Sequence, residues 1–210
     1  SWINNAKVIK KLRGKRNSTV KLTILRPLNN SIFDVIVIRD QITTKTIDAF
    51  YNVNDSTGYI KIAQFSSSTP LELKNALNNF NHSNIKKLII DLRDNSGGFL
   101  DAAIMVADNF LQKNQLIVYT QGRNRKKQEY KASGDGLYKD KKLIILINEF
   151  TASAAEIVAG AIQDNDRGTI VGRRSFGKGL VQEQMQMPDG SAIRLTIARY
   201  YTPSGRCIQN

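Results

Sequence analysis

The stretch KLIIDLRDNSGG, residues 87–98, joins a continuous apolar run to a turn with two adjacent glycines. An uninterrupted apolar run of this length is typical of a strand that is buried on both faces of a parallel sheet. The pattern recurs where LIILI, residues 143–147, leads into a predicted helix at residues 154–161. Strands that alternate with helices in this way predict an α/β fold.

Apolar periodicity predicts further elements on both sides of these runs. We expect helices at residues 69–80 and 100–111, and strands at residues 58–63, 116–119, 169–172, 180–187 and 192–201. The first of these helices has a clear start, with Thr69 as the expected N-cap, Pro70 in the first turn and Glu72 closing a capping box. Residues 120–141 are predicted to form a polar, glycine-containing excursion.

The first 41 residues predict a separate, incomplete unit. A short helix from residue 6 is followed by a turn and two strands at residues 20–25 and 33–38, and residues 40–46 are a polar linker. Two strands and one helix cannot bury a full core. We therefore predict the end of a small domain at residues 1–43 and a main domain at residues 44–210.

The charge, apolar runs and cysteine content of the chain limit the classes of function that it can have. The net charge is +13, and its densest part, RNRKK at residues 123–127, is predicted to be a solvated loop tip. No aromatic residue is interleaved with it to stack on bases, so nucleic acid is not an expected partner. No apolar run is long enough for a membrane span, and the chain opens without a signal-peptide pattern. The single cysteine, Cys207, excludes an internal disulfide.

The only histidine, His82, lies in a polar string and is predicted to be an exposed loop residue. A Ser-His-Asp mechanism needs a buried and oriented imidazole. If the chain is a hydrolase, its general base is therefore expected to be another residue.

Ser153 is the candidate nucleophile. It lies in NEFTASAAE, residues 148–156, where a buried strand passes through a short turn into a helix of small residues. A hydroxyl at a helix mouth lies beside free backbone N–H groups, and the N–H of Ala154 is placed to stabilise an oxyanion. The alternative for this segment alone is that Thr151 or Ser153 merely caps the helix.

Lys178 is the candidate base, in GRRSFGKG at residues 172–179. The segment resembles a phosphate-binding loop, but Gly179 replaces the magnesium-binding hydroxyl residue and a strand pattern follows instead of a helix. Burial among apolar groups would lower the pKa of a lysine enough for it to act as a base, and the amide of Gln182 could orient the amine. The alternative is an exposed lysine in a glycine hinge.

The turn in residues 91–98 offers a second oxyanion donor, because adjacent glycines let backbone N–H groups approach a ligand closely. The alternative is a plain strand-to-helix turn in which Arg93 and the neighbouring aspartates form ion pairs.

Together these segments resemble the carboxyl-terminal processing peptidases, or tail-specific proteases. The matching stretches, in the family's order, are residues 58–62, 91–98, 151–157, 175–182 and 195–206. The resemblance implies that Ser153 is the nucleophile, Lys178 the base and Gln182 the residue that orients the lysine. It also implies an oxyanion hole made by Ala154 and one glycine of the pair Gly97 and Gly98, of which Gly98 is favoured.

The resemblance also implies a crotonase-like α/β core preceded by a PDZ domain, of which residues 1–43 would be the C-terminal half. Ser96 departs from the family, which often has proline or glycine there. The implied activity is a serine endopeptidase without metal or other cofactor, acting on protein or peptide substrates with accessible C-termini. A homo-oligomer or adaptor, membrane association through segments outside this chain, and a cell-envelope or periplasmic location are further expectations.

Two other functions stay open at this point. A non-catalytic relative of the same fold would bind a peptide or an apolar ligand, and a nucleotide-phosphate binder would use residues 172–179.

Overall fold

The computed structural model describes residues 4–40, 45–83 and 85–210. Contacts divide the chain into two compact units, Ser1–Thr44 and Lys45–Asn210, and each is described by itself. Most of the linker predicted at residues 40–46 lies outside the described residues, and the division of the chain into domains stays a prediction.

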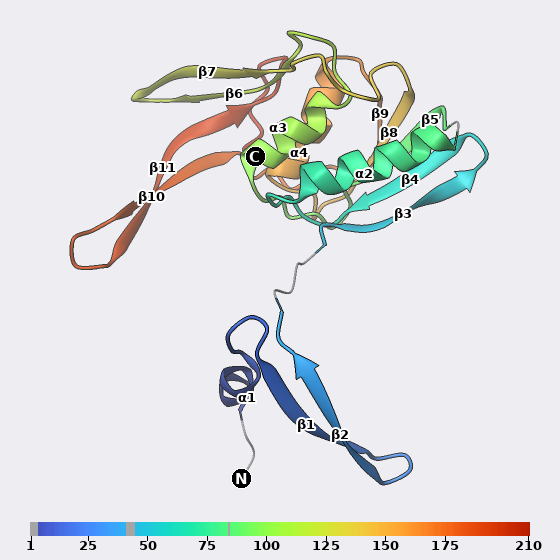
Figure 1. Cartoon of the computed structure of the whole chain (residues 1–210). Coiled ribbons are helices and arrows are strands. Elements are labelled where there is room, and N and C mark those ends of the chain that lie inside the picture. Colours follow the sequence, from blue (N-terminus) through green and yellow to red (C-terminus); the bar gives the residue numbers. More distant parts are fainter. Residues whose placement is uncertain (1–3, 41–44, 84) are drawn as a thin grey trace. The chain divides into compact units, whose positions relative to one another are not determined.

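The first unit consists of one helix and one antiparallel hairpin, as expected from its sequence (Figure 1). Its elements are α1 (Asn5–Leu12), β1 (Thr19–Arg26) and β2 (Ser31–Ile38). Asn4 caps α1 by accepting a hydrogen bond from the Lys7 N–H at 3.0 Å. No described residue of this unit is buried, so the unit has no core of its own.

The second unit is built on a five-stranded sheet in the order β3-β4-β5-β8-β9. The strands are β3 (Ile47–Asn54), β4 (Thr57–Ile62), β5 (Lys87–Asp91), β8 (Lys142–Ile147) and β9 (Thr169–Gly172). The last four are parallel and β3 is antiparallel to β4, which confirms the α/β class. The sequence did not predict β3, because most of this edge strand is exposed and carries no continuous apolar run.

A second, antiparallel sheet has the order β10-β11-β6-β7. Its strands are β6 (Leu116–Gly122), β7 (Arg125–Lys131), β10 (Leu180–Gln186) and β11 (Ala192–Tyr201). The polar excursion contains a strand that the sequence did not predict, β7, a charged strand held by its ladder to β6. Only Arg123 and Asn124 of the basic cluster form the hairpin turn. Lys127 lies in the strand and pairs with Glu129.

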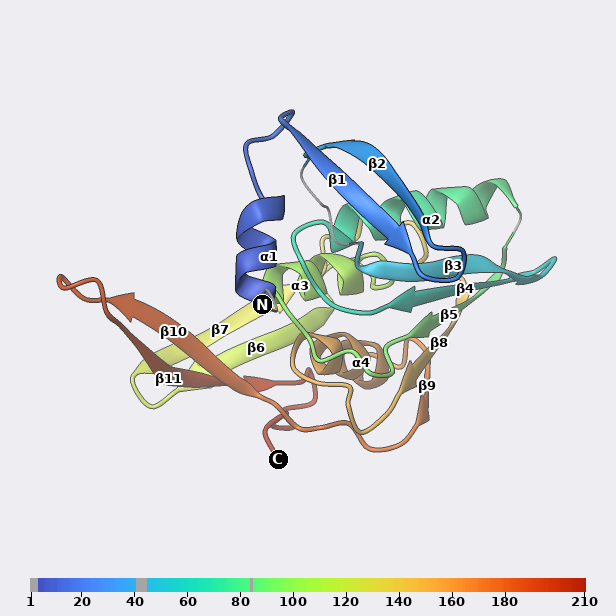
Figure 2. The same cartoon turned by 90° about the horizontal axis from the view of Figure 1, so that it is seen from below.

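Three helices complete the unit: α2 (Thr69–His82), α3 (Leu100–Asp108) and α4 (Ala154–Asp164). Helices α3 and α4 pack against each other and against β6, while α2 packs on β3 and β4. Figure 2 shows α4 between β6 and β9. Small residues on α4 permit this close packing, and every residue from Ala154 to Ile162 is buried. Among the described residues, no helix has the length and apolar content needed to cross a lipid bilayer.

Two details of α2 differ from the prediction. The N-cap is Ser68 and not Thr69, and the Glu72 carboxylate accepts bonds from the Ser68 hydroxyl and from the N–H groups of Thr46 and Ile47. Glu72 therefore ties the start of β3 to the helix instead of closing a box with Thr69. His82 is the last residue of α2 and not a loop residue, and its side chain lies outside the described part.

The parallel strands determine where a site can form. Because their carboxyl ends share one edge of the sheet, the segments that follow β5 and β8 lie side by side there. These segments contain the glycine pair and Ser153.

Candidate active site

Ser153 is the N-cap residue of α4 and has an unusual backbone conformation, with φ 56° and ψ −117°. A positive φ at a non-glycine residue is strained, at a cost of about 1–3 kcal/mol, and such strain clusters at functional sites. Its N–H donates to Glu156 Oε2 at 2.8 Å. The N–H of Ala154, the next residue, has no hydrogen-bond acceptor among the described residues.

The glycine pair lies directly against this turn. A Cβ at Gly97 would lie 2.7 Å from the Ser153 Cβ and 3.0 Å from the Ala154 nitrogen, and one at Gly98 would lie 1.9 Å from the Phe65 carbonyl oxygen. Both glycines also have positive φ, 100° and 144°. Only glycine fits either position, and the turn lies against Ser153 and Ala154 at Gly97.

The N–H groups of the two glycines differ in whether they are already hydrogen-bonded within the protein. The Gly97 N–H donates to Asn95 Oδ1 at 2.8 Å, whereas the Gly98 N–H has no acceptor within the described part of the chain. The N–H groups that lack an acceptor in these two adjoining turns are therefore those of Gly98 and Ala154.

Buried amide side chains hold the two loops together. Asn95 is fully buried, and its Nδ2 donates to the Ile62 carbonyl at 2.8 Å, while its backbone carbonyl accepts from the Ala152 N–H at 2.9 Å. Asn148 accepts from the Asp94 N–H at 2.9 Å. These bonds fix the turn after β5 against the turn after β8.

An ion pair lies at the end of β5, so the plainer alternative for this segment is also correct. The Asp91 carboxylate is 1% exposed and lies 2.6 Å from both the Arg93 guanidinium and the Tyr59 hydroxyl. Burial alone would raise the pKa of Asp91, but hydrogen bonds from Arg93 and Tyr59 outweigh it and lower the pKa to about 2. Burial, together with this carboxylate, raises the pKa of Tyr59 to about 12. The pair anchors the strand end from which the glycine turn departs.

Lys178 lies in the irregular segment between β9 and β10, and its backbone is tied to the nucleophile turn. Its N–H donates to Glu156 Oε2 at 2.8 Å, the same oxygen that accepts from Ser153. The Gly177 N–H donates to Glu156 Oε1 at 2.7 Å.

The Lys178 side chain is exposed, so the expectation that it is buried among apolar groups is wrong for this structure. The segment runs along the surface, and Lys178 borders an open cavity of about 410 Å³ together with Asp94, Ser96, Phe150, Ala152 and Phe176. Its amine makes no hydrogen bond or ion pair with Ser153 or with any other described residue.

Gln182 lies on β10, where the register shifts next to Val181, and it faces Thr196 of β11. It is exposed, and its side chain has no hydrogen-bond partner among the described residues. The structure thus brings Gly97, Gly98, Ser153 and Ala154 together and leaves Gln182 unconnected to the lysine amine.

A phosphate-binding loop is excluded by the local fold. The segment after Lys178 continues into β10 and not into a helix, as the sequence predicted. No helix N-terminus is therefore available at this loop to bind a phosphate.

Glu156 is the residue of the site to which the sequence analysis assigned no role. A glutamate three residues after a serine at a helix start is the signature of a capping box, which predicts its bond to the Ser153 N–H. Its bonds to Gly177 and Lys178 depend on the tertiary fold.

Comparison with known proteins gives consistent matches. The model of peptidase family S41 matches residues 56–210. A carboxyl-terminal-processing protease of Picosynechococcus is 40% identical over 195 residues, which cover 92% of this chain and 47% of that protein. A carboxy-terminal-processing protease of Bartonella bacilliformis is 40% identical over 206 residues, with 96% and 47% covered.

Among solved structures, the photosystem II D1 C-terminal processing protease matches with a TM-score of 0.73 and 29% identity, covering 93% of this chain and 54% of that one. The chain spans about half the length of these relatives.

Proposed function

Because the chain belongs to peptidase family S41, we propose that it is a serine endopeptidase that cleaves protein substrates near their C-termini. The observation that carries the proposal is the strained Ser153 at the mouth of α4, followed by the free N–H of Ala154 and in contact with the glycine turn, in which the Gly98 N–H is also free. A binding module would have no use for a nucleophile paired with two unoccupied donors.

In the proposed reaction, the Ser153 hydroxyl attacks the scissile carbonyl carbon and Lys178 accepts its proton. The resulting oxyanion accepts hydrogen bonds from the Ala154 and Gly98 N–H groups, which are worth most where charge develops in the transition state. The tetrahedral intermediate collapses, the lysine returns the proton to the leaving amine, and an acyl-enzyme remains on Ser153. Water then attacks that ester while Lys178 accepts its proton, and the lysine returns the proton to the Ser153 oxygen as the ester bond breaks.

The lysine amine must move onto Ser153 for this chemistry. The backbone of Lys178 already shares one carboxylate oxygen with the Ser153 N–H, so a change in the side-chain torsions of Lys178 is the motion required. We assign Gln182 the role of orienting the amine once it has moved. Substrate that fills the cavity beside Phe150 and Phe176 would remove water from around the amine.

We also propose that residues 44–210 form a crotonase-like peptidase core and that residues 1–43 are the C-terminal half of a PDZ domain. In the first unit, none of residues 4–40 is buried, and apolar side chains such as Leu25, Ile32 and Ile36 are exposed. Such a surface is typical of one that further protein covers. Strand addition to a PDZ domain would deliver the substrate C-terminus.

Further parts of the proposal come from the family alone. They are a location in the cell envelope or periplasm, assembly as a homo-oligomer or with an adaptor, and membrane association through segments outside this chain.

The test is cleavage of an unstructured protein of known C-terminal sequence, with products identified by mass spectrometry. Wild type should produce fragments cut near the C-terminus, and Ser153→Ala and Lys178→Ala should each lose at least about 100-fold in rate. Ser175→Ala and Lys126→Ala are matched controls and should keep the wild-type rate. A fluorophosphonate should label Ser153 and no other serine. Cleavage that persists in Ser153→Ala would refute the assignment, and binding without any cleavage would favour the non-catalytic relative.

A further inference from the structure

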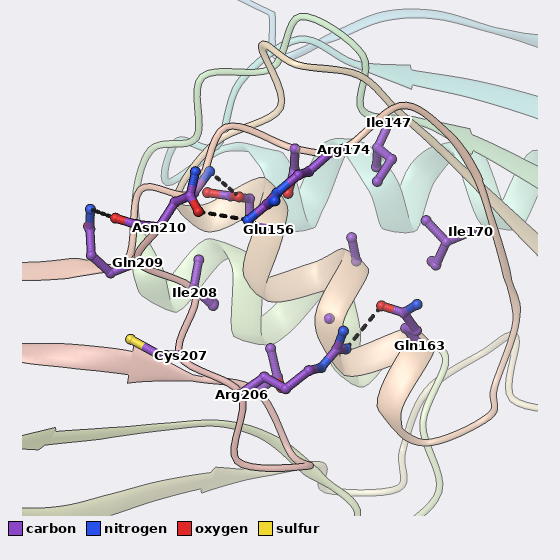
Figure 3. Close-up of a pocket in the computed structure, with 15 residues that line it drawn as sticks. Ile147, Glu156, Gln163, Ile170, Arg174, Arg206, Cys207, Ile208, Gln209 and Asn210 are labelled. Carbon is purple, nitrogen blue, oxygen red and sulfur yellow. Dashed lines mark hydrogen bonds between the residues drawn. The ribbon is translucent and has the colours of Figure 1, made fainter.

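Glu156 is a buried carboxylate in an unusual setting. It is 5% exposed, and no described lysine or arginine forms an ion pair with it. Its two carboxylate oxygens instead accept hydrogen bonds from three backbone N–H groups. The donors are Ser153, Gly177 and Lys178, at 2.8, 2.7 and 2.8 Å. Figure 3 shows it at one end of a cavity of about 440 Å³, near Arg174 and Asn210.

The Glu156 side chain is bound through both of its carboxylate oxygens. Oε2 accepts from Ser153 and Lys178, and Oε1 accepts from Gly177, so both oxygens must act as acceptors. Hydrogen bonds to an ionised acceptor are roughly twice as strong as neutral ones. The position near the N-terminus of α4 also favours a negative charge. These effects offset the cost of burying the carboxylate without a cation.

The segment of residues 173–179 depends on these bonds. It has no regular secondary structure, and the N–H groups of Gly177 and Lys178 have no other acceptor among the described residues. Further anchors on the segment are the bonds from the Phe176 N–H to the Thr151 carbonyl and from the Asn210 N–H to the Gly177 carbonyl. Next to Lys178, the Gly179 N–H donates to Gln209 Oε1 and the Gly179 carbonyl accepts from the Tyr200 N–H.

We propose that Glu156 is a positioning residue that fixes the backbone of the general base relative to the nucleophile. One side chain holds the N–H of Ser153 and the N–H of Lys178 on a single oxygen atom, so the two reactive residues cannot drift apart independently. The role rests on the proposed function of Ser153 and Lys178. Glu156 touches neither the substrate nor the reacting atoms.

Substitution by glutamine tests this role with little change in shape. The glutamine carbonyl can accept from Ser153 and Lys178, but its NH₂ group cannot accept from Gly177, so one of the three bonds is lost. We expect Glu156→Gln to lower kcat at least tenfold, with KM changed less than twofold. Glu156→Ala, which loses all three bonds, should lower kcat further.

Glu72→Gln is the matched control. Glu72 also accepts two backbone N–H bonds and a hydroxyl bond near the start of a helix, at 2.9, 3.0 and 2.7 Å, but it lies on α2 away from Ser153. The Glu72→Gln variant should have a lower midpoint of unfolding than wild type and an unchanged kcat. Equal kcat in the two glutamine variants would mean that Glu156 serves the stability of its helix alone, and would overturn the proposal.

Hydrogen exchange of the backbone amides tests the proposed role of Glu156 even if the protein is inactive. In wild type, the Gly177 and Lys178 amides should be protected although their segment is irregular, and Glu156→Gln should speed their exchange at least tenfold while Glu72→Gln leaves it unchanged. Exchange at the unprotected rate in wild type would overturn the proposal whatever the activity. If protection is found but cleavage does not depend on Ser153, the proposed function fails and the structural link stands.

Discussion

Gly97 lies directly against Ser153, and a Cβ at Gly97 would come within 2.7 Å of the Ser153 Cβ. Gly97→Ala must therefore displace either the glycine turn or the nucleophile turn. We expect kcat/KM to fall about 100-fold or more, the loss typical of removing an oxyanion donor, and stability to fall by about 1–3 kcal/mol. Steady-state kinetics and urea unfolding measure the two effects.

Gly190→Ala is the control for Gly97→Ala, because it introduces backbone strain without a steric clash. Gly190 also has a positive φ, 84°, but has no atom within 4 Å of its Cβ position. We expect the Gly190→Ala variant to be about 1 kcal/mol less stable than wild type and to have the same kcat/KM. Wild-type activity in Gly97→Ala would show that the glycine turn does not form the oxyanion hole.

The cavity beside Lys178 predicts a preference for apolar substrate residues. Phe176 and Phe150 border it and are each 60% exposed, so they present apolar surface next to the proposed reaction centre. We expect Phe176→Ala to raise KM about tenfold, roughly 1.4 kcal/mol of binding, for peptides with a large apolar residue at the cleavage point. Phe50 is an exposed phenylalanine on β3, and Phe50→Ala is the control variant, in which KM should not change. An equal effect for peptides with a charged residue at that point would contradict an apolar subsite.

The sequence predicted the parts of the fold that are encoded by continuous apolar runs. The runs at residues 87–92 and 143–147 form parallel neighbouring strands of the central sheet. The expected burial on both faces is wrong for β8, where Ile144 is exposed. The edge strand β3 and the charged β7 were missed, because their conformation depends on ladders to a neighbour and not on an apolar pattern.

The same limit applies to the site. Ser153, Ala154 and the glycine pair are local features of two strand ends, and their association follows from sheet topology. Lys178 belongs to an irregular segment whose exposure no periodicity encodes. The three donors to Glu156 come from two segments more than twenty residues apart, and local sequence predicts only one of them.

The Asp91 ion pair predicts a loss of stability in acid. Its pKa of about 2 lies below the value of about 3.9 expected in an unfolded chain. The carboxylate therefore contributes stability that is present above pH 4 and is lost as the pH falls toward 2, about 2 kcal/mol in all.

Asp91→Asn removes this contribution. The variant should be about 2 kcal/mol less stable at pH 7, because the bonds that Arg93 and Tyr59 donate to the carboxylate are lost or weakened, and its unfolding free energy should change less between pH 4 and pH 2. Urea unfolding at pH 7, 4, 3 and 2 tests both points. Asp135→Asn, at an exposed position, should behave as wild type. Parallel pH profiles for wild type and Asp91→Asn would contradict the argument.

Arg167 predicts a stability effect without an effect on the reaction. Its guanidinium donates to the carbonyls of Phe110, Tyr138 and Lys141, and so joins three segments at the edge of the sheet opposite Ser153. Arg167→Met leaves those carbonyls without a charged donor, which should cost about 2–4 kcal/mol. Arg167→Lys keeps the charge but cannot reach all three carbonyls, so its stability should lie in between. At a temperature where each variant is folded, kcat should equal that of wild type. A lower kcat with the fold intact would mean that this edge of the sheet transmits strain to the glycine turn and the nucleophile.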